Sequence, residues 1–172
     1  MFVPGDSLLP LLESEPSSGW DTIYASHTNH EITMYYPMRV VRTKNYKLIL
    51  NLNYKMPFPL DMDLVYSPAF NDLLNRTEHH EPTHWFSTLD KYYYRAPFEL
   101  YDILSDPHEL KNLANDSQYA PVMTQLLTQL REWQHKTNDP WRCAPYAVLM
   151  YDGKCKVVDN SVPIPTFVKQ EL

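Results

Sequence analysis

The chain has 172 residues, a formal charge of −6, and a composition that is 44% hydrophobic and 13% aromatic. This length permits one domain with its own core, and the hydrophobic content excludes a disordered chain. The acidic balance argues against a general nucleic-acid binder, and no apolar run approaches the length that spans a bilayer. Fifteen prolines against three glycines favour extended, turn-rich connections over a compact helical bundle.

Residues 1–31 are rich in Ser, Pro and acidic groups, and we interpret them as loop with limited local structure. Two strands are then predicted over about 32–42 and 46–53. A two-residue turn at Lys44-Asn45 would place Val41 opposite Leu48, Val40 opposite Ile49, and Arg42 opposite Lys47. Two like charges that face each other directly are unfavourable, so this last pair fits either a wet edge of the sheet or the neighbourhood of an anion.

A short helix is predicted to begin at Pro68 with Ser67 as its N-cap, and residues 76–91 are interpreted as a polar loop. A further strand is expected over 98–103. Ser105-Asp106-Pro107 supplies turn and helix-start chemistry, which predicts a short helical turn after that strand.

The clearest element is a helix from about Tyr119 to Lys136, because apolar residues recur every three or four positions. This stripe is expected to be core, and it consists of Tyr119, Val122, Met123, Leu126, Leu127, Leu130 and Trp133. Residues 137–172 are expected to be irregular, with a hairpin around residues 151–154. The predicted fold class is α+β: a small antiparallel sheet packed against one long C-terminal helix.

Several stretches of the chain resemble a known family in their amino-acid sequence and in their order along the chain. The run Phe98-Glu-Leu-Tyr-Asp, followed by Asp106-Pro-His-Glu and Asn112-Leu-Ala, resembles a segment near the C-terminus of sulfatases. The stretches 30–42, 46–59, 72–77, 92–96 and 139–145 are similar to the sulfamidase branch, which removes N-linked sulfate from heparan sulfate. The similarity runs from about Gly5 to the C-terminus.

The resemblance implies a division of the chain and a place for the chemistry. Residues 1–31 would be a remnant and linker from the end of the large sulfatase domain, and residues 32–172 the C-terminal domain. The catalytic α/β domain, with its formylglycine nucleophile and calcium ion, would lie outside this chain. No cofactor is therefore expected on the chain itself, which alone is expected to be inactive. Met1 is interpreted as a fragment boundary, an internal methionine or a wrongly assigned start.

The resemblance also bears on the compartment and on covalent modification. Residues 1–12 lack the features of a signal peptide, and the family implies a lysosomal parent that is routed through the secretory pathway. Cys143 and Cys155 could be free thiols, but the family favours a disulfide worth about 3 kcal/mol. Two sequons make Asn75 and Asn115 candidate N-glycosylation sites.

The best candidate for substrate binding is the segment from His27 to Arg42. By resemblance it approaches the mouth of the substrate cleft, where His30 and Glu31 could contact sugar hydroxyls, and Arg39 and Arg42 could face sulfate or carboxylate groups. The two arginines point to opposite faces of a regular strand, and an equal alternative is that they tie the sheet to acidic groups. The chain has Asn29 where the family has a second histidine.

The sequence does not favour a cysteine nucleophile, a zinc site or a sugar-stacking platform. Cys143-Ala-Pro-Tyr-Ala147 lacks the small residue and the arginine of the sulfatase nucleophile motif, so Cys143 is excluded as a nucleophile. Zinc sites need about four well-placed ligands, so solvated loop histidines are favoured over metal sites at 79–84 and at His27 and His30. For residues 92–94, packing is favoured over a sugar platform because alternate strand residues face opposite ways.

The partners expected for this chain are the catalytic domain of the full-length parent, heparan sulfate fragments and a second copy in a homodimer. No nucleic acid and no membrane are expected. Two alternatives to a sulfohydrolase part stay open: a non-catalytic sugar-binding or interaction module, and an incomplete gene-model fragment that exposes an apolar face.

Overall fold

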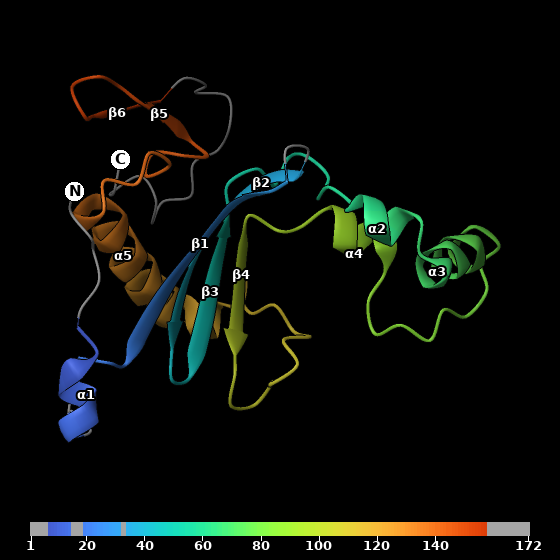
Figure 1. Cartoon of the computed structure of the whole chain (residues 1–172), viewed down its shortest axis with the longest axis horizontal. Helices are drawn as coiled ribbons and strands as arrows, with labels where there is room; N and C mark the ends of the chain where they lie inside the picture. Colours follow the sequence, from blue (N-terminus) through green and yellow to red (C-terminus); the bar gives the residue numbers. More distant parts are fainter. Residues whose placement is uncertain (1–6, 15–18, 32–33, 158–172) are drawn as a thin grey trace.

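A computed structural model describes residues 7–14, 19–31 and 34–157 of the chain. Four strands form one antiparallel sheet in the order β1-β2-β3-β4, and helix α5 crosses behind it in Figure 1. The strands are β1 (Thr22–His30), β2 (Met34–Thr43), β3 (Tyr46–Asn51) and β4 (Phe98–Asp102), and the helix is α5 (Ala120–Lys136). The predicted α+β architecture, a small antiparallel sheet packed against one long helix, is confirmed.

Shorter elements flank this layer pair. A helical lobe, defined here as residues 62–93, extends beyond β4, and a two-stranded hairpin lies beyond the C-terminal end of α5 (Figure 1). These elements are α1 (Leu9–Glu13), α2 (Met62–Val65), α3 (Pro68–Glu78), α4 (Leu89–Tyr93), η1 (Ser117–Tyr119), β5 (Ala147–Leu149) and β6 (Cys155–Val157). No helix in the described part of the chain is long and apolar enough to cross a lipid bilayer.

The register between β2 and β3 is the predicted one. Val41 pairs with Leu48, Val40 with Ile49, and Arg42 with Lys47. The backbone N–H of Tyr46 donates to the Thr43 hydroxyl at 3.1 Å, which closes the turn. Arg42 is exposed, and Lys47 forms an ion pair with Glu109, so a nearby carboxylate offsets the repulsion between the two cations.

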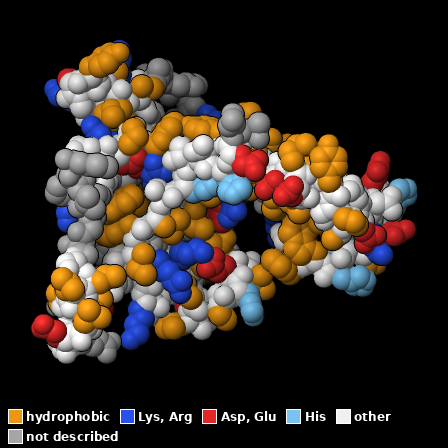
Figure 2. Space-filling view, viewed as in Figure 1, with side chains coloured by type: hydrophobic (Ala, Val, Ile, Leu, Met, Phe, Trp, Pro, Cys, Tyr) orange, Lys and Arg blue, Asp and Glu red, His pale blue; other side chains and the backbone are white. Residues whose placement is uncertain are grey.

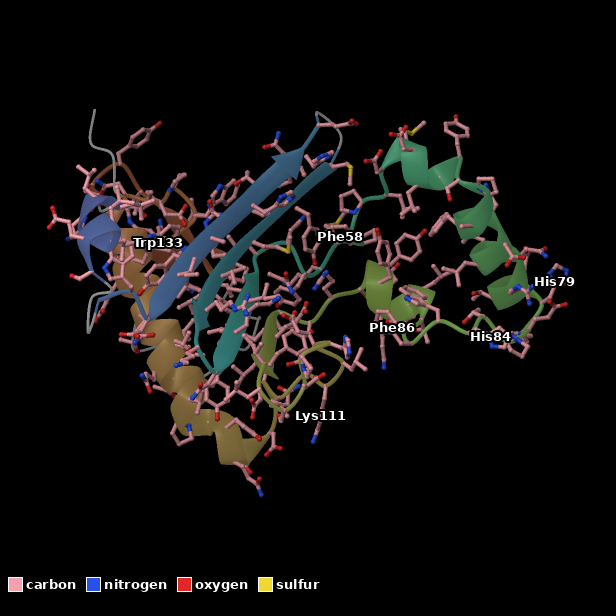
Figure 3. The ribbon with its side chains drawn as sticks, turned by 60° about the horizontal axis from the view of Figure 1, so that its bottom comes forward. Phe58, His79, His84, Phe86, Lys111 and Trp133 are labelled. Carbon is pink, nitrogen blue, oxygen red and sulfur yellow. A yellow bond between two sulfur atoms is a disulfide. The ribbon has the colours of Figure 1, made fainter. Side chains whose placement is uncertain are left out.

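The core lies between α5 and one face of the sheet. Val41, Leu48, Leu50 and Leu100 are fully buried, and the apolar stripe of the helix packs on them. The buried members of that stripe are Met123, Leu126, Leu127 and Leu130. Trp133, labelled in Figure 3, stacks on Tyr24 of β1 with ring centroids 5.3 Å apart, so the helix contacts the sheet as far as its first strand.

The interpretation of residues 1–31 as loop was wrong for Thr22–His30, which forms β1. This edge strand buries little: Tyr24 packs on the helix side, whereas Ile23 on the other face is 65% exposed. Its sequence therefore shows almost no alternation of apolar and polar residues, and the strand is defined by its pairing with β2. The boundary between a large-domain remnant and a C-terminal domain at residue 31 stays a prediction.

The helical lobe is more regular than predicted. The Ser67 cap is confirmed, since its hydroxyl accepts from the Phe70 N–H at 3.2 Å, but α3 continues to Glu78. The loop predicted over 76–91 is therefore shorter at both ends, because the Thr88 hydroxyl caps a further helix, α4. Tyr92 and Tyr93 belong to that helix, so treating them as strand residues was also wrong.

The predicted Asp-Pro turn follows β4, where the Asp106 N–H donates to the Asp102 carbonyl at 2.8 Å, but no helix begins at Ser105-Asp106-Pro107, which corrects the prediction of a helix start there. Side chains instead hold an irregular loop against the strand. The Asp106 carboxylate accepts from the Lys111 N–H at 2.8 Å. Asn112 accepts from the Leu100 N–H at 2.9 Å and donates to the Phe98 carbonyl at 3.0 Å, in the manner of an extra strand residue.

The chain after α5 forms the predicted hairpin, β5 paired with β6. Cys143 and Cys155 are joined in a disulfide, which decides between the two readings of the cysteines. Cys143 thus has no thiolate with which to act as a nucleophile. The expectation of irregular structure over 158–172 lies outside the described residues.

The core predicts the effect of shortening a buried leucine. Replacing Leu127, at the centre of the stripe on α5, with alanine should lower the free energy of unfolding by about 2–5 kcal/mol, because it removes buried methyl groups and leaves a cavity. Urea unfolding followed by circular dichroism measures this change. The matched control is Leu104→Ala, since Leu104 is 70% exposed in the turn after β4. Equal losses in both variants would contradict this core.

Candidate functional site

The end of β1 brings together three side chains that can bind ligands. The ligating atoms of His30, Glu31 and Asp61 all lie within 4.8 Å of one another. His30 and Glu31 are exposed, and Asp61 is half-buried. Glu31 adopts a left-handed backbone conformation with φ of 58°, uncommon for a residue other than glycine, and its carbonyl accepts from the Asn29 amide at 3.3 Å.

Asp61 was not predicted to belong to this group. It precedes α2, where its carboxylate accepts from the Asp63 N–H at 3.0 Å and caps that helix. Thirty positions separate it from Glu31, and the sequence carries no spacing signal that connects them. Within the described residues, this is the one set of three such groups close enough to share a metal ion; His79 and His84 lie at the far end of the helical lobe (Figure 3).

The three residues do not fit the calcium ion that the sulfatase resemblance implies. Calcium takes six to eight oxygen ligands, whereas this exposed group offers two carboxylates and an imidazole. We therefore assign no metal-dependent step to it. Its chemistry is that of two hydrogen-bonding carboxylates and an imidazole in contact with solvent.

A β-bulge sets the direction of the strand end that carries His30. The register between β1 and β2 shifts between His27 and Asn29, opposite buried Tyr36 and Pro37. Proline has no N–H for the ladder, so it is tolerated at such an interruption. Arg39 reaches the backbone here, because its Nη1 donates to the carbonyl oxygens of His27 at 3.0 Å and Met38 at 2.8 Å.

Arg39 is 4% exposed and is also bound to the end of α5. Its Nε and Nη2 donate to the two carboxylate oxygens of Asp139 at 2.6 and 2.8 Å, which is the bidentate arrangement. Gln134 donates to the same carboxylate at 2.8 Å. Burial alone would raise the pKa of Asp139, but the hydrogen bonds from Arg39 and Gln134 outweigh it and hold this pKa below its ordinary value.

Arg42 lies far from His30. It pairs with Ile23 at one end of β1, whereas His30 pairs with Met34 at the other. The eight residue steps from Met34 to Arg42 correspond to about 26 Å along a strand. The four residues predicted to bind substrate thus occupy three places. His30 and Glu31 lie at one end of the sheet and Arg42 at the other end, whereas the side chain of Arg39 in β2 is buried.

A separate cavity of about 440 Å³ lies between β4 and the helical lobe, where Figure 2 shows the molecule hollowed. We call it the aromatic pocket. It is lined by Trp85, Phe86, Ser87, Lys91, Tyr92, Tyr94, Arg95, Ala96, Glu99, Tyr101, Glu109, Leu110 and Asn112. Of this set, sequence reasoning considered as sugar contacts only residues in the run 92–95. Tyr92 and Tyr94 do line one cavity, because they lie on and just after a helix.

Glu99 is the buried anion at the floor of the aromatic pocket. It receives two hydrogen bonds from Arg95, both at 2.8 Å, one from the Tyr101 hydroxyl at 2.8 Å and one from the Asn51 amide at 2.6 Å. Burial would raise the pKa of Glu99, but these donors and the charge of Arg95 together lower it. Burial and the neighbouring carboxylate of Glu99 raise the pKa of Tyr101, which therefore stays a neutral donor.

Both candidate glycosylation sites are exposed. Asn75 lies on α3, and Asn115 lies in the turn before η1. Their modification remains a prediction.

Comparison with known proteins places these features in a family. The chain is 53% identical over 164 residues to human N-sulphoglucosamine sulphohydrolase, covering 94% of this chain and 32% of the relative. It is 29% identical over 138 residues to an ulvan-active sulfatase of Formosa agariphila, covering 78% of this chain and 25% of that protein. No family model matches the chain.

Solved structures share the fold. A 2-O GAG sulfatase aligns with a TM-score of 0.51 and 18% identity over 90% of this chain and 23% of its own. A Bacteroides thetaiotaomicron sulfatase structure aligns with a TM-score of 0.50 and 19% identity over 92% of this chain and 23% of its own. At these identities the likeness concerns the fold alone.

The α+β fold and the extended sequence similarity together define a sulfatase module, and the chain belongs to the sulfatase family. Within that family it is a homologue of N-sulphoglucosamine sulphohydrolase. The chain spans about a third of the length of this relative and about a quarter of the ulvan-active sulfatase.

The buried ion pair predicts how stability depends on pH. Because the pKa of Asp139 is lower in the folded chain than in the unfolded one, its stabilising contribution is complete above the unfolded value of about 3.9 and is lost as pH falls through the folded value. Replacing Asp139 with asparagine should destabilise the chain by about 3–5 kcal/mol near neutral pH, since it leaves Arg39 buried without an anion. The variant should also lose less stability than the parent on acidification.

Urea unfolding at a series of pH values from neutral to acid measures both effects. Asp152→Asn is the matched control, because Asp152 is an exposed carboxylate in the β5–β6 hairpin. Identical pH profiles for the parent and the Asp139 variant would contradict the assigned role of the carboxylate.

Proposed function

We propose that the chain is the C-terminal part of a sulfohydrolase that removes N-linked sulfate from glucosamine residues of heparan sulfate. The observation that carries this proposal is the similarity to N-sulphoglucosamine sulphohydrolase along nearly the whole chain, at an identity well above that of the ulvan-active sulfatase. The proposed setting is the lysosome, reached through the secretory pathway. The disulfide and the exposed sequons at Asn75 and Asn115 are compatible with that route.

In this proposal the chemical step lies outside the chain. A formylglycine nucleophile and a calcium ion would supply it from the catalytic domain. This chain would supply substrate contacts and their positioning. His30 and Glu31 are exposed at the strand end and would accept hydrogen bonds from sugar hydroxyls or from the amine that carries the sulfate.

Arg39 would act as a positioning residue for these contacts. Its bonds to the His27 carbonyl and to Asp139 connect the bulge before His30 to the end of α5, so the strand end has a defined orientation. Arg42 is too distant to contact the same sugar residue as His30. It would instead face an anionic group elsewhere on a longer chain.

A chimera tests this assignment. Human N-sulphoglucosamine sulphohydrolase whose C-terminal third is replaced by this chain should release sulfate from N-sulfoglucosamine. His30→Ala and Glu31→Gln should each lower kcat/KM about ten- to a hundredfold, because a hydrogen bond to a charged group contributes about 1.5–3 kcal/mol. Lys44→Gln, in the turn at the opposite end of β2, is the control and should change it less than about twofold.

An active chimera whose rate is the same in all three variants would exclude His30 and Glu31 as substrate contacts. A folded chimera without sulfate release would contradict the proposed function.

The isolated 172-residue chain should release no sulfate from N-sulfoglucosamine, because the proposed nucleophile belongs to another part of the protein. The measurement is sulfate release by ion chromatography, with the active chimera as positive control. Turnover by the pure isolated chain would show that catalytic groups lie within these residues.

A further inference from the structure

The aromatic pocket is built from two walls and a floor. Residues 85–93 of the helical lobe and the three residues that follow them form one wall, the loop 109–112 forms the other, and Glu99 and Tyr101 of β4 lie between them. Its volume of about 440 Å³ lies within the range of small-molecule sites. Phe86 and Tyr94 are 76% and 59% exposed, so two aromatic rings face solvent at the cavity instead of packing in the core.

Edge-to-face and tilted ring contacts join the lobe wall to the sheet. Tyr36 of β2 contacts Phe58 with centroids 4.9 Å apart, Phe58 contacts Tyr92 at 5.7 Å, and Tyr92 contacts Trp85 at 6.3 Å. Figure 3 shows Phe58 and Phe86 on the side of the lobe nearer the sheet. The opposite wall is held by Asn112, which bonds to both Leu100 and Phe98 of β4. Both walls are therefore formed before any ligand arrives, which lowers the cost of binding.

The charges that line the pocket leave one cation uncompensated. The Glu99 carboxylate is neutralised by Arg95, and Glu109 forms an ion pair with Lys47. Lys91 has no carboxylate within ion-pair distance among the described residues. Three N–H groups of the Arg95 guanidinium likewise have no acceptor within the described ranges. A ligand in this cavity thus contacts aromatic rings and positively charged hydrogen-bond donors.

We propose that the aromatic pocket is a second glycan-binding site, which takes one acidic sugar ring. The ring would pack on the aromatic side chains, and its carboxylate or sulfate group would accept hydrogen bonds from Lys91 and Arg95. The proposal rests on the proposed function to the extent that the acidic ring is a neighbouring unit of the polymeric substrate. It assigns a site that is separate from His30 and Glu31.

The test measures binding to the full 172-residue chain by titration calorimetry. The probes are a heparin-derived tetrasaccharide, an unsulfated N-acetylheparosan tetrasaccharide that carries only carboxylates, and neutral chitotetraose. We expect one or both acidic probes to bind and chitotetraose to bind at least about tenfold more weakly. Binding of both acidic probes shows that a carboxylate suffices, and binding of the heparin probe alone identifies sulfate as the recognised group.

Variants locate the binding site. Lys91→Gln and Tyr94→Ala should each weaken binding about fivefold, which corresponds to about 1 kcal/mol for an exposed charge or an aromatic contact. Matched controls are Lys136→Gln at the end of α5 and Tyr151→Ala in the β5–β6 hairpin, both exposed and remote from the pocket lining. Circular dichroism confirms that each variant is folded.

The proposal is overturned if no acidic probe binds, if chitotetraose binds equally well, or if the pocket variants bind like their controls. These results are independent of the chimera, which acts on a monosaccharide and reports on His30 and Glu31, neither of which lines the pocket. Loss of glycan binding with an active chimera rejects only the second site, whereas an inactive chimera with intact binding rejects only the proposed catalysis.

Discussion

Arg39 and Asp139 are a hundred residues apart, and their buried ion pair joins the sheet to the end of the helix that covers it. The pair is tolerated in the core because its polar atoms are satisfied: two backbone carbonyls accept from Arg39, and Gln134 and the Trp141 N–H donate to Asp139. A buried pair of this kind contributes little net stability compared with apolar packing. Its main consequence is geometric, since the bulge in β1 and β2 and the turn after α5 take one relative position.

A second ion pair, in which the Glu99 carboxylate accepts four hydrogen bonds, plays a similar part on the other face of the sheet. Arg95 and Glu99, together with Tyr101 and Asn51, hold the start of β4 against the chain that leaves the helical lobe. The first pair orients the strand end that carries His30 and Glu31, and the second forms the floor of the aromatic pocket. Both solvent-facing groups of side chains thus depend on an ion pair. Arg39 and Asp139 lie on distant segments of the chain, whereas Arg95 and Glu99 are four residues apart at the start of β4.

The predictable parts of this fold are those where one face of an element is continuously apolar. The stripe on α5 predicted the buried face of the helix, and the two-residue turn at Lys44-Asn45 predicted the register between β2 and β3. The same reasoning did not predict that Arg131 and Gln134 are buried. Polar residues that are buried in a hydrogen-bond network do not add to the apolar pattern from which burial was predicted. It also missed β1, where one face is solvent-exposed, and Asp61, whose meeting with His30 depends on the path of the whole lobe.

The segment from Asp106 to Leu113 shows why a sequence resemblance can be strong while the local structure of the segment is mispredicted. Its residues look like a helix start, but Asp106 holds a backbone N–H five residues ahead, and Asn112 bonds to β4 on both sides of Glu99. The N–H of Leu113 then continues this pairing to the Leu100 carbonyl at 2.8 Å. The contacts of Asp106 and Asn112 each require a particular side chain at a particular position, whereas that of Leu113 joins backbone atoms. The constraint on the motif is therefore the geometry of one wall beside β4, and that wall borders the aromatic pocket.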